Sequence, residues 1–367
     1  MRPDGILRIL QDAGFEAYYV GGCVRDRLLG RPCSDWDITT SALPEQVMTL
    51  FDHTVPTGVR HGTVTVLLDK EQAEVTTFRD DGAYSDSRHP EQVRFVRSLR
   101  DDLSRRDFTV NAMAQAPDGR IIDLFGGQAD LKAELLRCVG DPETRFREDA
   151  LRMLRACRFA AQLGFTIEEA TWGGITVCAP LCANLSRERV RDEVQKVLLS
   201  EQPEWLEPMI SLGLLAACGV QDSADLRWLR TLPAEAEARW AGLKLLLPTL
   251  DLRQFRLPGK LTVLCARAAE AYRPERTDLE WKHLIADEGW ETAKLTAVLC
   301  AGDAVDRIAR SGDCVQLSQL AVTGSDFPSL FGKEVGTALH RLLDYVLEHP
   351  EENRRERLLA LADSFSH

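Results

Sequence analysis

The spacing of hydrophobic and polar positions divides the chain into a mixed N-terminal part and a helical remainder. Ile6, Ile9 and Leu10 share one face of a helix whose other face is polar, which predicts a short amphipathic helix ending near Gly14. Short runs with β-type composition follow at residues 18–20, 35–38, 63–68 and 73–78, the last two as a hairpin. We therefore expect a small mixed sheet flanked by helices over residues 1 to 135.

From Pro142 onward the apolar spacing lengthens to three or four residues, as in Leu151, Leu154 and Cys157. This spacing is typical of a helix face, and scattered prolines divide the remainder into helices of moderate length. The pattern predicts an α+β protein in three parts, over residues 1–138, 139–200 and 201–367.

Composition and charge narrow the class of protein. A hydrophobic share of 44 % and a charged share of 28 % are typical of a soluble globular protein. No apolar run approaches the roughly 18 residues that a membrane span needs, and no secretory signal is evident, so we expect a cytoplasmic protein. The ten cysteines contain no C-x-x-C pair and are interpreted as reduced core thiols. The net charge of −12 argues against a broad basic surface, so an RNA partner has to be inferred from a local site.

The first chemically informative stretch begins at Gly21-Gly22, directly after a predicted strand. Two glycines let the backbone turn its N–H groups towards an anion, and Arg25 adds a charged donor for phosphate oxygens. Asp35 and Asp37 follow, two apart in a predicted strand, so both carboxylates project from the same face.

Two carboxylates at such a short distance repel each other unless a cation lies between them. Magnesium prefers carboxylates and phosphate oxygens, and two such ions could activate a hydroxyl and stabilise a leaving pyrophosphate. Glu74, in the next predicted strand, is a candidate third carboxylate, with a solvent-exposed strand residue as the alternative.

Two further segments carry clustered charges. Arg105 and Arg106 offer guanidinium groups suited to a triphosphate, with a surface ion-pair cluster as the alternative. Residues 147–159 are predicted to form one helix, on which Asp149 and Arg152 are neighbours three residues apart. An ion pair on a solvated helix is one interpretation. The other is recognition of a base, because adenine and cytosine each present an amino donor beside a ring acceptor, whereas guanine and uracil present the reverse.

Together these segments resemble the class II tRNA nucleotidyltransferases, the CCA-adding enzymes, which share a polymerase-beta-like head with bacterial poly(A) polymerases. The resemblance is dense over residues 18–165 and continues thinly at residues 320–326 and 332–336. It implies a polymerase-beta-like nucleotidyltransferase head with a small mixed sheet, followed by an all-helical neck, body and tail. The head would be catalytic, the neck would recognise the base, and the body and tail would bind tRNA.

The resemblance also implies roles for individual residues. Asp35 and Asp37 would be catalytic and bind the metal. The residues expected to bind the nucleotide are Gly22, Arg25, Arg106, Asp149, Arg152, Arg155 and Arg158, with Glu148 opening the family's E-D-x-x-R motif.

The implied reaction is template-independent addition of CCA to the 3′ end of tRNA from CTP and ATP, with Mg²⁺ as cofactor. The expected partner is the acceptor arm and 3′ end of tRNA, with no membrane partner, and a homodimer is left open. Alternatives are a partial CC- or A-adding enzyme, a poly(A) polymerase and an inactive RNA-binding module. Residues 79–90 are predicted to form a mobile loop that lets one site take CTP and then ATP.

Overall fold

The computed structural model describes residues 3–33, 35–67, 72–81, 93–96 and 98–364. The chain divides into two compact units, Met1–Gln221 and Asp222–His367. Most of the predicted hairpin turn at residues 69–72 lies outside the described residues, as does most of the predicted loop at residues 79–90, of which residues 79–81 form a strand.

A seven-stranded mixed sheet forms the base of the first unit, with strand order β3-β4-β5-β2-β1-β8-β9. Only β2 and β5 pair in parallel, and the other neighbours are antiparallel. The strands are β1 (Ala17–Val20), β2 (Trp36–Thr40), β3 (Thr54–Gly58), β4 (Thr63–Leu67), β5 (Gln72–Thr77), β8 (Met113–Gln115) and β9 (Ile121–Asp123). In β5, buried Ala73, Val75 and Thr77 alternate with Gln72 and Glu74, as expected for a strand with one face in the core.

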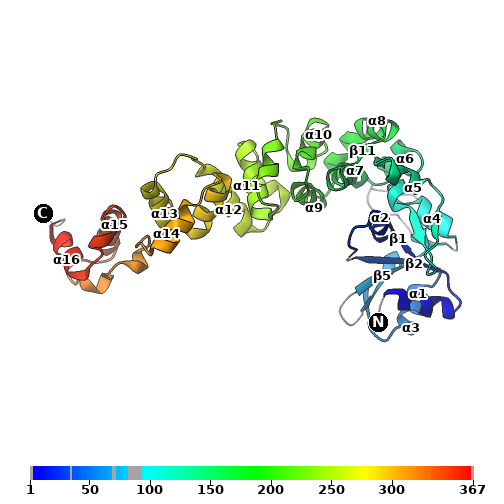
Figure 1. The fold of residues 1–367 in the computed structure, drawn as a ribbon, viewed down its shortest axis with the longest axis horizontal. Coiled ribbons are helices and arrows are strands. Elements are labelled where there is room, and N and C mark those ends of the chain that lie inside the picture. Colours follow the sequence, from blue (N-terminus) through cyan, green and yellow to red (C-terminus); the bar gives the residue numbers. More distant parts are fainter. Residues whose placement is uncertain (1–2, 34, 68–71, 82–92, 97, 365–367) are drawn as a thin grey trace. The chain divides into compact units, whose positions relative to one another are not determined.

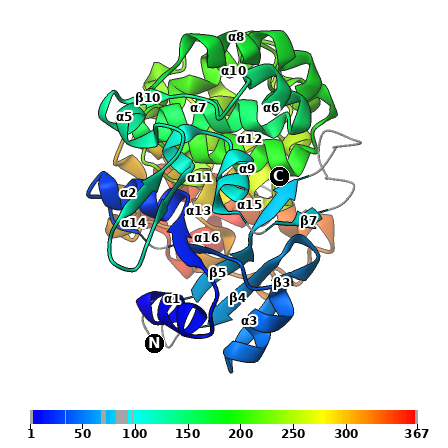
Figure 2. The same ribbon diagram turned by 90° about the vertical axis from the view of Figure 1, so that its right-hand side faces the viewer.

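Helices cover both faces of this sheet. Helices α1 (Pro3–Asp12) and α3 (Pro44–Leu50) lie on one side, and α6 (Pro142–Glu148) and α7 (Leu151–Leu163) lie on the other (Figure 1, Figure 2). Tyr19 and Ile38 pair across β1 and β2, and the Tyr19 hydroxyl donates to Asp4 of α1 at 2.7 Å. The α1 side of the sheet therefore carries the core, while Asp37, adjacent to Ile38 in β2, projects towards the opposite side.

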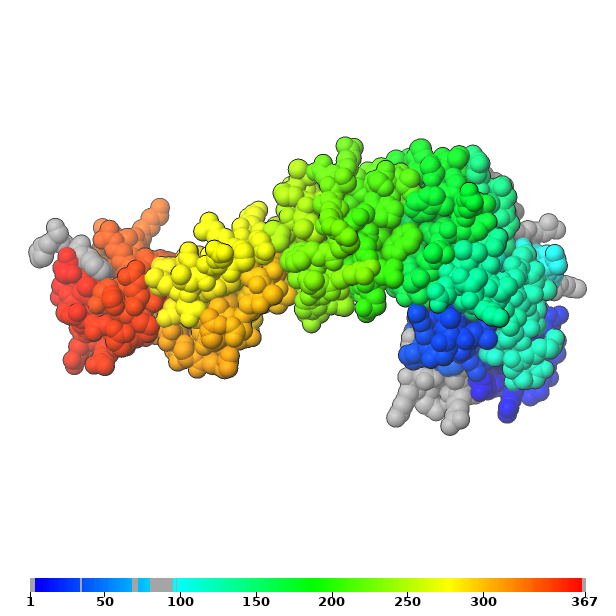
Figure 3. All heavy atoms as spheres, turned by 45° about the horizontal axis from the view of Figure 1, so that its top comes forward, coloured from blue at the N-terminus to red at the C-terminus, as the bar shows by residue number. Residues whose placement is uncertain are grey.

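The rest of the first unit is mainly helical. Its remaining elements are α2 (Gly22–Leu28), β6 (Arg79–Asp81), β7 (Val93–Phe95), α4 (Leu99–Ser104), α5 (Gly127–Lys132), β10 (Leu135–Leu136), β11 (Thr166–Ile167), α8 (Glu169–Cys178), α9 (Arg187–Leu198) and α10 (Leu206–Ser211). Helix α7 packs on α9, and the parallel pair β10–β11 joins the sheet-bearing part to these helices. In the space-filling view the atoms from cyan to green form one continuous body (Figure 3).

The second unit consists of helices in the part of it that the structure describes. They are α11 (Ala236–Leu246), α12 (Gly259–Glu270), α13 (Asp278–Leu299), α14 (Ala304–Ser311), α15 (Lys333–Glu348) and α16 (Arg355–Ser364). One core includes Trp281, Ile285, Val305, Leu342 and Leu358. No helix in the described ranges is long and apolar enough to cross a membrane. The predicted α+β class, a small mixed sheet followed by helices, is confirmed.

Candidate active site

The first part of the site is built where β1 ends and β2 begins. Gly21 follows β1 with a φ of 73° and a ψ of −139°, a conformation that glycine adopts far more readily than other residues, and α2 starts at Gly22. The sequence predicted Asp35 inside a strand. Strand β2 begins at Trp36, so Asp35 lies just before it. Both Asp35 and Asp37 nevertheless line the same cavity.

The carboxylate of Asp37 sits in an environment that disfavours its charge. Burial raises its pKa to about 6, and the charges of Glu74 and Asp35 act in the same direction, against the opposing effect of the Arg106 guanidinium. Glu74 stands opposite Asp37 in the parallel register of β5 and β2. A cation between the two aspartates would relieve this repulsion, so these residues fit a divalent metal ion.

Among the described residues there is no group of three or more His, Cys, Asp or Glu side chains that could hold a metal. Asp35 and Asp37 therefore offer two carboxylates to a divalent ion, whose remaining ligands would be waters and substrate phosphates.

Helix α4 ends at the two predicted arginines and orients them. Asp102, fully buried, forms ion pairs with Arg105 at 2.8 Å and with Arg106 at 3.3 Å, and accepts a hydrogen bond from the Thr39 hydroxyl. Although burial opposes it, the two guanidinium charges hold the pKa of Asp102 below its ordinary value. An ion-pair cluster was the alternative interpretation of these arginines. It exists, but its acid is internal and leaves Arg105 and Arg106 lining the cavity.

A chain of hydrogen bonds connects α7 to α2 through the segment after Arg106. Asp107 Oδ2 accepts from Arg155 Nε at 2.8 Å, and Asp107 Oδ1 accepts from Asn111 Nδ2 at 3.1 Å. Asn111 Oδ1 in turn accepts from Arg25 Nη1 at 2.7 Å. Burial alone would raise the pKa of Asp107, but Arg155 and the hydrogen bonds lower it to about 2. This carboxylate therefore stays charged and fixes arginines from both sides of the cavity.

The structure corrects the predicted single helix over residues 147–159. Helix α6 ends at Glu148, Asp149 has an extended backbone with φ −141° and ψ 104°, and α7 begins at Leu151. Asp149 Oδ1 accepts from the Leu151 N–H at 3.0 Å, which satisfies a donor in the first turn of α7. The prediction that Asp149 and Arg152 are neighbours on one helix face is therefore wrong. Arg152 instead forms an ion pair with Glu148 at 2.7 Å.

Phe159 packs against three arginines at one end of the cavity. The guanidinium carbons of Arg158, Arg25 and Arg155 lie 3.8, 5.1 and 5.4 Å from the centre of its ring. Arg158 also forms a buried ion pair with Glu193 of α9 at 2.5 Å. These contacts hold α7 side chains in defined positions.

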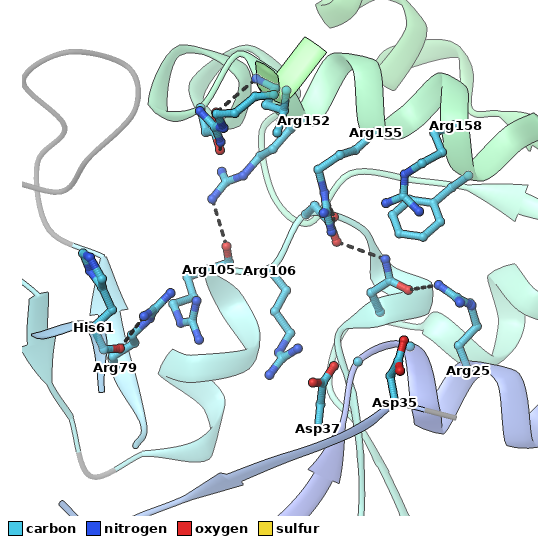
Figure 4. Close-up of a pocket in the computed structure, with 18 residues that line it drawn as sticks. Arg25, Asp35, Asp37, His61, Arg79, Arg105, Arg106, Arg152, Arg155 and Arg158 are labelled. Atoms are coloured by element: carbon cyan, nitrogen blue, oxygen red, sulfur yellow. Dashed lines mark hydrogen bonds and ion pairs between the residues drawn. The ribbon is translucent and has the colours of Figure 1, made fainter. Parts of the chain in front are cut away.

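All of these groups surround one cavity of about 650 Å³ (Figure 4). Asp35 and Asp37 lie at one side of it, with Arg25 beside Asp35 and Arg106 pointing towards Asp37, and Arg152, Arg155 and Arg158 extend from the opposite side. The residues expected to be catalytic or to bind the nucleotide line it: Gly22, Arg25, Asp35, Asp37, Arg106, Asp149, Arg152, Arg155 and Arg158. Glu148 of the E-D-x-x-R motif and the candidate third carboxylate, Glu74, are not among the lining residues.

Seven lining residues were not predicted as site residues: His61, Arg79, Asp107, Asn111, Leu151, Phe159 and Arg189. Arg79 donates to the His61 carbonyl, which links β6 to the 3-10 helix Val59–His61. The alternation of polar positions at residues 107, 109 and 111 was a signal for Asp107 and Asn111. Arg189 lies 40 residues from its partner Asp149, and no local pattern marks it.

Comparisons with known proteins agree with this geometry. Residues 17–137 match the family described as the poly(A) polymerase head domain, and residues 164–218 match the probable RNA- and SrmB-binding site of polymerase A. The chain is 40 % identical to a CCA-adding enzyme of Enterococcus faecalis, covering 97 % of this chain and 94 % of that one. It is 41 % identical to the CCA-adding enzyme of Geobacillus kaustophilus, covering 97 % and 95 %.

A solved structure also indicates similarity to the CCA-adding enzymes. The crystal structure of the Bacillus stearothermophilus CCA-adding enzyme in complex with CTP superposes with a TM-score of 0.86 at 36 % identity, covering 100 % of this chain and 98 % of that chain. Identity at this level over nearly the whole length of both chains shows the family. The chain belongs to the CCA-adding enzymes, a family of nucleotidyltransferases.

Proposed function

We propose that this chain adds C, C and A in turn to the 3′ end of tRNA, taking CTP and ATP as substrates and releasing pyrophosphate. The observation that carries the proposal is the single cavity in which Asp35 and Asp37 face eight arginines. Its place in a chain similar to CCA-adding enzymes over nearly their full length supports the same activity.

We propose Mg²⁺ as the divalent ion, held by Asp35 and Asp37. Bound there, it would supply the Lewis acidity that activates the 3′-hydroxyl and stabilises the leaving pyrophosphate. Arg106 lies beside Asp37 and would bind triphosphate oxygens next to the reacting phosphorus. Arg25, held by Asn111 and Asp26, would contribute a second guanidinium whose orientation is set before the substrate arrives.

The number of guanidinium groups in the cavity supports a polyanionic substrate. Eight arginines line it, and carboxylates such as Asp102, Glu148 and Glu193 pair with several of them and hold them in place. Guanidinium groups suit phosphate because they donate two parallel hydrogen bonds. Within the same cavity, the Asp149 carboxylate and Arg152 would select the base through its amino donor and ring acceptor.

We propose the three-part division of residues 1–138, 139–200 and 201–367 as catalytic head, base-recognising neck and tRNA-binding body and tail. The match of residues 164–218 to a probable RNA-binding site supports contact with RNA there. A solved Thermotoga maritima CCA-adding enzyme is described as complexed with tRNA_CCA, and its 18 % identity to this chain supports the fold alone. A cytoplasmic location and a homodimer stay predictions.

The test is an extension assay on three tRNA transcripts, ending before CCA, after the first C and after CC. Purified protein is incubated with each transcript, Mg²⁺, CTP and ATP, and the product ends are sequenced. The double variant Asp35→Asn/Asp37→Asn is the matched control for a contaminating activity.

We expect all three transcripts to end in CCA and to stop there. Termination at CC with ample ATP would indicate a CC-adding enzyme. Extension only of the transcript ending in CC would indicate an A-adding enzyme, and a long A tract from ATP alone would indicate a poly(A) polymerase. Each of these three outcomes would contradict the proposal.

A further inference from the structure

Asp149 is held from two sides in the junction between α6 and α7. Its Oδ1 accepts from the Leu151 N–H at 3.0 Å, and its Oδ2 accepts from Arg189 Nη2 at 2.8 Å. Each carboxylate oxygen has a second acceptor site, so the group can still take a hydrogen bond from a base. The direction of that acceptor depends on the rotation of the carboxylate, which Arg189 restrains.

Arg189 belongs to α9, and the packing of that helix fixes its position. Glu193 lies four residues further, on the same face of α9, and its ion pair with Arg158 joins this face to α7. The pair of Arg189 and Asp149 is partly buried, with side chains 26 % and 19 % exposed. Arg189 therefore contacts Asp149 from a helix whose position is fixed by packing on α7 and not from a surface loop.

Arg189 also lines the cavity, as Asp149 does. Its Nη1 is buried and has no hydrogen-bond partner among the residues that the structure describes. The contact through which Arg189 acts on the site is therefore its ion pair with the Asp149 carboxylate.

Arg152 is placed differently. Its guanidinium donates to Glu148 at 2.7 Å and to the carbonyls of Arg145 and Arg105 at 3.1 Å each. The cation that the structure pairs with the Asp149 carboxylate is thus Arg189.

We propose that Arg189 is a positioning residue for base selection, which holds the Asp149 carboxylate so that it accepts from the amino group of cytosine or adenine and repels the carbonyl of uracil or guanine. This inference rests on the proposed function. Without the Arg189 guanidinium, Asp149 can rotate about its side-chain torsions, and a carboxylate that turns away distinguishes an amino group from a carbonyl poorly.

The test compares nucleotide selectivity in Arg189→Met, Arg189→Lys, Asp149→Ala and the double variant Asp149→Ala/Arg189→Met. For each, kcat and KM for CTP and UTP are measured separately on a transcript lacking CCA. Arg191→Met is the matched control, since Arg191 lies on the same helix, pairs with Asp192 and does not line the cavity. Thermal unfolding of every variant identifies a folding defect.

We expect Arg189→Met to lower the preference for CTP over UTP by about tenfold, the size of one hydrogen bond to a charged group. Arg189→Lys should recover part of this preference, and the double variant should match Asp149→Ala alone, because Arg189 acts through Asp149. Arg191→Met should keep the wild-type ratio.

Equal loss of kcat/KM for both nucleotides, with the ratio unchanged in Arg189→Met and Arg189→Lys, would show a structural role and overturn the inference. A further loss of selectivity in the double variant beyond Asp149→Ala would overturn it as well. Wild-type protein that adds CCA in the same assay separates either result from failure of the proposed function.

Discussion

Arg106 and Asp37 lie together against the backbone of Gly21. A Cβ atom at this glycine would come to 3.1 Å from Arg106 Nη1 and to 3.4 Å from Asp37 Oδ2. The turn after β1 therefore has no side chain at the point where Asp37, the proposed metal carboxylate, and Arg106, the proposed triphosphate arginine, approach each other.

Substituting Gly21 should consequently disturb both groups. We expect Gly21→Ala to lower kcat/KM by about 100-fold, since displacing reacting groups by a fraction of an ångström to an ångström can have this effect. Gly14→Ala is the matched control, because Gly14 has a similar φ of 86° with nothing near its Cβ position. The control should lose about 1 kcal/mol of stability through backbone strain alone and keep its activity. Equal activity of both variants would contradict the role of Gly21.

The two aspartates should be required for the reaction but not for tRNA binding. Asp35→Asn and Asp37→Asn each remove a carboxylate that fits the metal, so we expect turnover to fall below detection in single-nucleotide incorporation. Binding of tRNA, followed by fluorescence anisotropy, should change little because we propose that the tRNA contacts lie in the helical part of the chain. Asp118→Asn, at an exposed position of the head, serves as the control. Near-normal turnover in either variant would refute the metal assignment.

Substituting Glu74 tests the proposed metal site with a smaller expected effect. It stands opposite Asp37 and raises the pKa of that carboxylate, yet it does not line the cavity. We expect Glu74→Gln to change the Mg²⁺ concentration for half-maximal rate by about tenfold, as for other residues just outside a metal's ligands. Glu45→Gln, in the exposed first turn of α3, should not change it. A loss as complete as in Asp37→Asn would instead make Glu74 a direct ligand.

Much of this site could be predicted from the sequence because its chemistry is concentrated in short segments. Gly21, Gly22, Asp35 and Asp37 are close along the chain, and alternation along a strand determines the face on which Asp37 lies. The hairpin of β4 and β5 follows from the same alternation. Local patterns of this kind predict the folded structure because each depends only on residues that are close in sequence.

The break in the helix at Asp149 could not be predicted in this way. Residues 147–159 have a helical pattern throughout, and the break coincides with two contacts of the Asp149 carboxylate, which accepts from the Leu151 N–H and from Arg189 of α9. The same reason hides the links of Asp107 to Arg155 and of Arg158 to Glu193, which join residues 48 and 35 positions apart. Tertiary contacts of this kind produce no periodic pattern of hydrophobic and polar residues in the sequence.

Asp107 leads to a prediction about stability and pH. Its pKa of about 2 in the folded protein lies below its ordinary value of 3.8, because Arg155 and the hydrogen bonds outweigh the effect of burial. Between these two values the unfolded chain binds more protons than the folded one, so folding becomes less favourable as the pH falls. The contribution of the carboxylate is present in full above about pH 5 and is lost as the pH falls through about 2.

We therefore expect Asp107→Asn to lower the free energy of unfolding by about 2 kcal/mol at pH 7, and by roughly half as much at pH 3. Urea unfolding of wild type and variant at both pH values measures the difference, and Asp118→Asn, whose ion pair with Arg120 is two-thirds exposed, should show neither effect. Arg155 remains charged in the variant, so part of the loss at neutral pH comes from leaving this guanidinium without its acceptor. That part does not depend on the ionisation of residue 107 and should persist at pH 3. A difference between wild type and variant that stays constant from pH 7 to pH 3 would show that Asp107 has an ordinary pKa in the folded protein.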